Sequence, residues 1–287
     1  MCRPPLLFFW RPVPWVGRGP DESAPRAVHE QIKLAVCPQL DRTAPTTVPS
    51  LFDLHVHTNR GSPDSALDPH DLVAEAKRIG LTGVVVTEHN GWPKHDFELF
   101  ANDVHDLVMI RALEVYTPLG HVLAFGLDSH IAPSVGGIEM VERLRGEVDR
   151  VGGALVIAHP FRFLFNPAGL FTQNKLFEDP RTVPTTAEQA AEHPVFGIVH
   201  EVEVVNGGGT RKENQFAHEV VSVLGIRGTG GSDAHSVAGL GKGTTAFPGD
   251  IRNERDLLDA LRAADFHAVE DFHVGRSIAY MTEPPTP

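Results

Sequence analysis

Cysteine is scarce in this chain of 287 residues, which contains only Cys2 and Cys37. Both thiols lie near the N-terminus, far from the polar motifs described below. Two such residues imply neither a disulfide framework nor a cysteine-based zinc site. The scarcity of cysteine fits a reducing compartment, and we expect a cytoplasmic protein.

Positive charge is also in short supply. The 25 lysine and arginine residues are outnumbered by 37 aspartate and glutamate residues, which gives a formal net charge of -12. Proteins that bind long duplex DNA neutralise its phosphates with lysine and arginine, so we exclude such DNA as a partner. A short strand or a nucleotide held through metal ions remains compatible with this charge.

Long apolar runs are missing too. No stretch approaches the roughly 20 apolar residues that a membrane-spanning helix needs. The apolar stretch at 6–10 is too short for the core of a signal peptide. We therefore expect no association with a membrane.

The first part of the chain differs in composition from the rest. Residues 1–49 are rich in proline and show few periodic apolar positions. We predict that 1–49 form a poorly ordered N-terminal extension and that 50–282 form one α/β domain.

Strand and helix patterns alternate after this extension. Phe52, Leu54 and Val56 alternate with polar residues, as in a β-strand. Asp68 is a typical N-cap and precedes an amphipathic helical pattern. Helices are expected at 69–79, 138–151, 212–224 and 251–263, and further strands at 81–87, 108–115, 122–125, 154–158, 198–205, 226–231 and 267–270. This alternation favours parallel βαβ units closed into a barrel, and the irregular stretch at 161–194 is typical of a binding loop or lid.

Histidine is plentiful, at 16 residues, and many of the histidines and carboxylates follow predicted strands. In β/α barrels the chemistry gathers at the C-terminal ends of the strands. Five strand ends carry such residues, namely His55 with His57, Glu88 with His89, Glu114, His159, and Asp233 with His235. Since residues i and i+2 of a strand point the same way, His55 and His57 can share one metal ion. This rule does not place His121, which precedes its apolar run, or Asp64, which lies in a turn-like stretch.

Seven short stretches, taken together, resemble the polymerase and histidinol phosphatase (PHP) domain family. In the family's order they are DLHVHT (53–58), TEHN (87–90), ALEV (112–115), GHVLAFG (120–126), IAHP (157–160), VEVVNG (202–207) and GGSDAH (230–235). The resemblance implies a distorted seven-stranded (β/α)7 barrel that holds two or three divalent metal ions and hydrolyses a phosphate ester.

The resemblance also implies which side chains hold the metals. The first metal would be bound by His55, His57, Glu114 and Asp233, the second by Glu114, His121 and His159, and the third by Asp64, His89 and His235. Imidazole and carboxylate ligands without thiolate fit Zn²⁺, Mn²⁺ or Fe²⁺ rather than Ca²⁺.

Two positions depart from the family's pattern. Glu88 stands where the family usually has aspartate, and Asp64 follows Ser62 by two positions, where the family's acidic ligand follows serine directly. We expect Glu88 and Asp53 to orient metal ligands rather than to bind metal themselves.

The expected reaction needs no serine or cysteine nucleophile. A metal-bound hydroxide held by Glu114 and Asp233 would attack phosphorus in line. Arg162 and Arg211 are candidate phosphate-binding residues, although each could instead be a solvated surface arginine. The expected substrate is a small phosphorylated molecule or a nucleotide, and the sequence carries no signal about the oligomeric state.

Two other functions remain open at this point. A metal-dependent amidohydrolase also begins a β/α barrel with His-x-His, but it often has a lysine at a mid-barrel strand end, where this chain has Glu114. A non-catalytic metal-binding PHP module should have lost ligands, whereas all nine expected ligands are present. We therefore favour the phosphoesterase.

Overall fold

The computed structural model describes residues 49–129, 136–165, 173–179, 181–272 and 278–279. Apart from Pro49, the extension predicted at 1–49 lies outside the described residues, and so does the end of the chain from residue 280.

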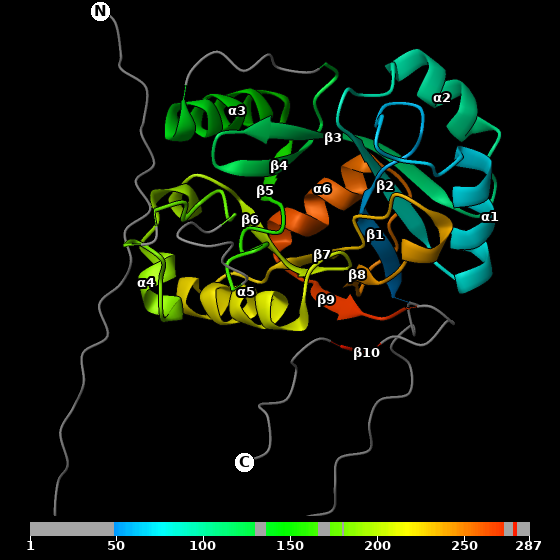
Figure 1. Ribbon diagram of the computed structural model, residues 1–287. Helices are drawn as coiled ribbons and strands as arrows, with labels where there is room; N and C mark the ends of the chain where they lie inside the picture. Colours follow the sequence, from blue (N-terminus) through cyan, green and yellow to red (C-terminus); the bar gives the residue numbers. More distant parts are fainter. Residues whose placement is uncertain (1–48, 130–135, 166–172, 180, 273–277, 280–287) are drawn as a thin grey trace, which may run out of the picture. The chain divides into compact units, whose positions relative to one another are not determined.

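The described residues form one large sheet with helices packed around it (Figure 1). Its strands are β1 (Ser50–Val56), β2 (Gly83–Glu88), β3 (Val108–Thr117), β4 (Gly120–Phe125), β5 (Ala154–Ile157), β6 (Glu201–Asn206), β7 (Thr229–Gly231), β8 (Gly243–Phe247), β9 (His267–Glu270) and β10 (Ile278–Ala279). They are ordered β10-β9-β8-β1-β2-β3-β4-β5-β6-β7. The pairs β1–β2, β2–β3, β5–β6 and β6–β7 are parallel, whereas β4 runs antiparallel to both β3 and β5.

The sheet closes because the chain leaving β7 pairs with the end of β1. The backbone N–H of Asp233 donates to the carbonyl of His55 at 2.7 Å, and the N–H of His57 donates to the carbonyl of Ala234 at 3.0 Å. Gly231 permits this approach, since a Cβ there would lie 2.4 Å from the Cβ of His55. The barrel that the sequence predicts is therefore confirmed.

The number of strands was wrong, because the sheet has more than the expected seven. Strands β1 to β7 form the closed ring. Beyond it, β8 pairs antiparallel with β1, β9 antiparallel with β8, and β10 antiparallel with β9. We did not predict β8 because Thr244 and Thr245 occupy two of its five positions, so it shows no apolar alternation, although all five residues are buried.

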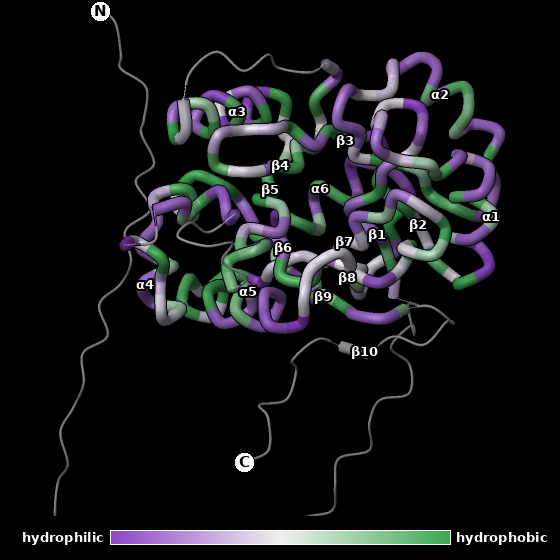
Figure 2. Tube along the Cα trace, viewed as in Figure 1, coloured by the Kyte–Doolittle hydropathy of each residue, from purple (hydrophilic) through white to green (hydrophobic). Residues whose placement is uncertain are grey.

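The helices are α1 (Pro69–Ile79), α2 (Lys94–Asn102), α3 (Gly137–Val151), α4 (Ala187–Ala191), α5 (Arg211–Leu224) and α6 (Glu254–Ala263). The Asp68 side chain caps α1 by accepting a hydrogen bond from the N–H of His70, and Gly80 ends the helix with a φ of 86°. Hydrophobic and hydrophilic residues alternate along α3 and α5 (Figure 2), as expected of helices that bury one face.

Some element boundaries differ from the predicted ones. The strand predicted at 198–205 begins only at Glu201, because a 3₁₀ helix at Pro194–Gly197 precedes it, and the strand predicted at 226–231 shortens to β7. We did not predict α2, which buries only Phe97 and has no side-chain cap. The stretch at 161–194 contains α4 and the start of that 3₁₀ helix. Within the described part of the chain, no helix has the length and apolar character required to cross a membrane.

Candidate metal centre

Two histidines at the end of β1 point into the mouth of the barrel. His55 and His57 are fully buried, and their Nε2 atoms lie 3.0 Å apart. The separation follows from the strand, on which residues i and i+2 share a face.

One carboxylate from β3 and one from the β7 exit complete a first cluster around these histidines. Nε2 of His55 lies 3.3 Å from Glu114 Oε1 and 3.5 Å from Asp233 Oδ1. Nε2 of His57 lies 3.2 Å from Glu114 Oε2 and 3.4 Å from the same Asp233 oxygen. Ligand atoms placed tetrahedrally at 2.0–2.2 Å from a zinc ion are about 3.3–3.6 Å apart. His55, His57 and Glu114 therefore have the spacing of a single metal site, and Asp233 forms such a group with His55 and His159.

Glu114 extends this cluster to a second site. Its Oε1 lies 2.8 Å from Nδ1 of His121 and 3.2 Å from Nε2 of His159. Its Oε2 lies 3.1 Å from Nδ1 of His89. A carboxylate with each oxygen facing different imidazoles is suited to bridge two cations.

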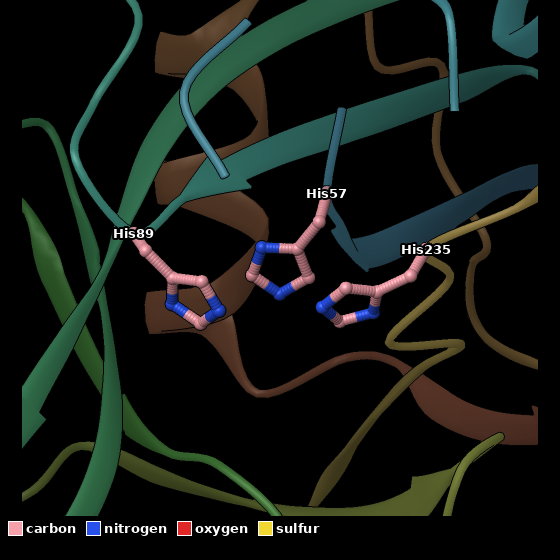
Figure 3. A group of neighbouring side chains, drawn as sticks. All are labelled: His57, His89 and His235. Carbon is pink, nitrogen blue, oxygen red and sulfur yellow. The ribbon is translucent and has the colours of Figure 1, made fainter. Parts of the chain in front are cut away.

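A third group of side chains lies toward the solvent. Oδ2 of Asp64 is 3.3 Å from Nε2 of both His89 and His235. The ring of His57 stacks with each of these two imidazoles at a centroid separation of 4.4 Å, and the centroids of His89 and His235 are 6.2 Å apart (Figure 3). Asp64 is the most exposed of these side chains, at 56%. All nine predicted ligands are thus brought together, including His121 and Asp64, which the strand-end rule did not place.

Two atoms in these clusters lack a hydrogen-bond partner within the described structure. Glu114 Oε2 and His121 Nδ1 are buried but unsatisfied, because their short contacts lack hydrogen-bond geometry. Buried polar atoms without partners are costly. Bound cations would supply the missing partners, so the residues fit the metals that the sequence implies.

The electrostatics of the clusters also favour positive charge. Burial by itself would raise the pKa of Glu114, but the surrounding imidazoles, led by His55, hold it well below its usual range. Burial would likewise raise the pKa of Asp233, and His55 together with His57 lowers it well below normal. Burial would lower the pKa of His55, yet Glu203, Glu114 and Asp233 raise it well above the usual value. Both carboxylates are therefore anionic at neutral pH.

The backbone is strained at two of the clustered residues. His159 and Asp233 follow β5 and β7 with positive φ angles of 32° and 54°. A non-glycine residue in this region costs about 1–3 kcal/mol and persists only where the surroundings enforce it. Here the strain accompanies two side chains that face the mouth of the barrel.

The sequence did not identify Glu203, a buried carboxylate on β6. Its Oε1 lies 3.0 Å from Nδ1 of His55, and its Oε2 accepts hydrogen bonds from the N–H of His159 and the side chain of Asn206, both at 2.9 Å. The available signal was the alternation of Glu201 and Glu203 with valines, which places both carboxylates on one face of the strand.

Asp53 and Glu88 lie beside the clusters rather than among them. Asp53 accepts hydrogen bonds from the backbone N–H groups of Ser232 and Gly241, and burial raises its pKa to about 6 although these bonds lower it. Glu88 accepts hydrogen bonds from Thr58 and from the hydroxyl of Ser62. Neither carboxylate contributes an atom to the groups that could hold a cation.

The two predicted phosphate-binding arginines lie in different surroundings. Nη2 of Arg162 donates to Asp233 Oδ2 at 2.5 Å and to Asn206 Oδ1 at 2.8 Å. Arg162 also lines a pocket of about 200 Å³ together with His121 and His159. Arg211 is exposed at the first position of α5 and does not line this pocket.

Family models match both ends of the domain. A model described as PHP domain matches residues 53–151, and one described as PHP-associated matches residues 211–266. The uncharacterized protein MJ1587 of Methanocaldococcus jannaschii is 23% identical over 118 residues, which cover 38% of this chain and 67% of that protein.

Solved structures share the fold. PsfC from Pseudomonas syringae has a TM-score of 0.53 at 18% identity, and the match covers 78% of this chain and 92% of PsfC. A two-domain protein from Bacteroides vulgatus, which contains a predicted PHP-like metal-dependent phosphoesterase, has a TM-score of 0.51 at 20% identity. That match covers 78% of this chain and 65% of the other protein.

Proposed function

We propose that this chain, which belongs to the PHP domain family, is a hydrolase that cleaves a phosphate ester with the help of two or three divalent metal ions. The observation that carries this proposal is the position of Glu114. Its two oxygens face five imidazoles from four strand ends at 2.8–3.3 Å. Such an arrangement is suited to hold neighbouring cations.

The proposed metals would be Zn²⁺, Mn²⁺ or Fe²⁺. When bound, they would polarise phosphoryl oxygens and lower the pKa of a water molecule enough for it to act as nucleophile. Glu114 and Asp233 would hold the cations that this water needs, and both are anionic at neutral pH for the reasons given above.

Arg162 supports a phosphate ester as the substrate. Its guanidinium donates to Asp233, the residue lines the pocket, and its buried Nε has no hydrogen-bond partner within the described structure. A guanidinium offers parallel donors that match two oxygens of one phosphate. We propose that it binds the phosphoryl group in this pocket, which His121 and His159 also line.

The serine hydroxyls of Ser62 and Ser232, which lie near the clusters, already contact other groups of the chain. Ser62 donates to Glu88, and Ser232 lies 3.4 Å from the carbonyl of His55. The hydroxyl of Ser62 also lies 3.0 Å from Nδ1 of His57, but its single hydrogen is donated to Glu88, so His57 is not placed to remove it as serine nucleophiles require. This supports water as the nucleophile.

The test compares metal-stripped protein with protein that is reloaded with one metal at a time. Phosphate release from a panel of phosphomonoesters and nucleotides is measured alongside hydrolysis of cyclic amides. We expect phosphate release only after reloading, and its loss in His159→Ala and Asp233→Ala. His95→Ala, which changes an exposed histidine on α2, should remain active. Turnover by metal-free protein, or turnover of amides alone, would overturn the proposal.

A further inference from the structure

The hydroxyl of Ser62 makes three contacts in the loop that follows β1. It lies 3.0 Å from Nδ1 of His57, 3.1 Å from the backbone N–H of His89 and 2.5 Å from Oε2 of Glu88. Ser62 is 1% exposed, so water does not compete for these bonds. A serine hydroxyl has one hydrogen to donate and two lone pairs to accept with.

The directions of these three hydrogen bonds follow from the partners. The carboxylate of Glu88 accepts, and it also accepts from the N–H and hydroxyl of Thr58, so Ser62 must donate its only hydrogen there. The backbone N–H of His89 can only donate, so it takes one lone pair of Ser62. The remaining lone pair faces His57, whose Nδ1 must therefore carry the hydrogen.

We propose that Ser62, held in direction by Glu88, is a positioning residue that keeps His57 in the tautomer with hydrogen on Nδ1. The Nε2 of His57 then keeps its lone pair, which points at the first cluster, 3.2 Å from Glu114 and 3.4 Å from Asp233. The inference rests on the proposed metal-dependent function, because only a metal ligand needs that lone pair.

The Nδ1 of His57 faces a hydroxyl, whereas the Nδ1 atoms of His55 and His235 face groups that can only accept a hydrogen bond. The Nδ1 of His55 faces the carboxylate of Glu203 at 3.0 Å, and the Nδ1 of His235 faces the backbone carbonyl of Asp233 at 2.9 Å. Both partners can only accept, so each holds a hydrogen on Nδ1 of its histidine. A hydroxyl can donate or accept, and it fixes the tautomer of His57 only if another group takes its hydrogen.

The ring of His57 packs closely against two other imidazoles. Its ring stacks on His89 and on His235, each with a centroid separation of 4.4 Å (Figure 3). Glu88 is one methylene longer than the aspartate expected at this position, and it contacts both Thr58 and Ser62. Glu88, which replaces the aspartate usual in the family, is thus the residue that sets the direction of the hydrogen bond between Ser62 and His57.

The experiment measures the tautomer and the metal affinity separately. The full chain is labelled with ¹⁵N-histidine and stripped of metal, and the pH is raised until the His57 ring is neutral, because burial lowers the pKa of His57 but hydrogen bonds to Asp233 and Glu114 raise it above the usual value. Imidazole correlation spectra then identify the tautomer of His57, assigned by its loss in His57→Gln. Zinc affinity is measured by calorimetry. In Ser62→Ala we expect a mixture of tautomers and a zinc affinity that is about 10- to 100-fold weaker, the usual effect of removing a group that orients a metal ligand.

Ser65→Ala is the matched control. Ser65 lies in the same loop, but its hydroxyl donates to the carbonyl of His57 rather than to its ring, so the tautomer should not change. Glu88→Ala is the second variant, in which Ser62 is free to donate to His57 and the hydrogen should move to Nε2. If Ser62→Ala does not fold, Glu88→Ala alone tests the proposal. An unchanged tautomer and unchanged zinc affinity in either folded variant would overturn the proposal. If the tautomer and affinity change as expected but no phosphate ester is cleaved by the parent protein, the proposed function fails instead.

Discussion

The carboxylate of Glu203 lies 3.0 Å from Nδ1 of His55, on the opposite side of the imidazole from the first cluster. Glu203 also accepts hydrogen bonds from the backbone of His159 and from the side chain of Asn206. Asn206 in turn accepts from Arg162. One buried carboxylate on β6 thus connects two candidate metal ligands to the arginine at the pocket.

Replacing Glu203 should therefore weaken metal binding without removing a ligand. In Glu203→Ala, His55 loses the acceptor that orients its ring, and we expect the affinity for zinc to fall about 10- to 100-fold. The N–H of His159 and the amide of Asn206 would also lose their acceptor, which should lower the free energy of unfolding by about 1–3 kcal/mol. Calorimetry and urea unfolding measure the two effects. An unchanged zinc affinity would contradict the orienting role.

Arg162 and Arg211 should behave differently when substituted. Arg162→Lys keeps the charge but loses the planar fork that binds two phosphate oxygens, so we expect KM for the phosphate ester to rise about tenfold or more. Such a rise in KM without a change in kcat would mean that the arginine binds substrate and transition state alike. Arg211→Ala serves as the comparison, since Arg211 is exposed and outside the pocket. An equal rise in KM in both variants would contradict the assignment of Arg162 as the phosphate-binding arginine.

Metal loading should stabilise the fold. Cations that bind only the folded chain raise its stability by mass action, by about 3 kcal/mol when the free metal is at 100 times its dissociation constant. We therefore expect the melting temperature to fall on chelation and to recover with added Zn²⁺ or Mn²⁺. Glu114→Gln replaces the central carboxylate by a neutral amide, so added metal should raise the melting temperature of this variant less than that of the parent chain. A melting temperature that does not respond to metal in the parent chain would be inconsistent with the assigned ligands.

The sequence located most of the candidate ligands because parallel strands end at one rim. His55, His57 and Glu114 follow that rule directly. His121 does not, because β4 runs antiparallel to β3 and His121 pairs with Tyr116 near its end. The start of an antiparallel strand lies at the same rim as the ends of its parallel neighbours, and this direction cannot be read from apolar periodicity.

The supporting residues were harder to predict. Glu203 acts through a contact with His55, which is distant in sequence, and Ser62 through a loop whose path depends on tertiary packing. Both contacts join segments that periodicity describes independently, so no local pattern contains them. Strand β8 escaped prediction for a different reason, since the composition of a fully buried threonine-rich strand resembles that of a loop.

Glu201 provides a test of the fold that does not involve the metal clusters. It is buried at the start of β6, and burial raises its pKa to about 7 from 4.5, although a hydrogen bond from the N–H of Gly228 and the charge of Arg227 lower it. The folded chain therefore holds this proton up to a higher pH than the unfolded chain does. Stability from this group is fully present below pH 4.5 and is lost as the pH rises through 7.

Glu201→Gln should remove this loss, because a neutral amide can still accept the hydrogen bond from Gly228. A rise in pKa from 4.5 to about 7 corresponds to roughly 3 kcal/mol, so we expect the metal-free variant to gain up to that amount over the parent at pH 8 and little at pH 5. Urea unfolding at the two pH values measures the difference, with Glu142→Gln, an exposed site on α3, as the control. If the gain is the same at both pH values, the carboxyl of Glu201 does not change its protonation on folding.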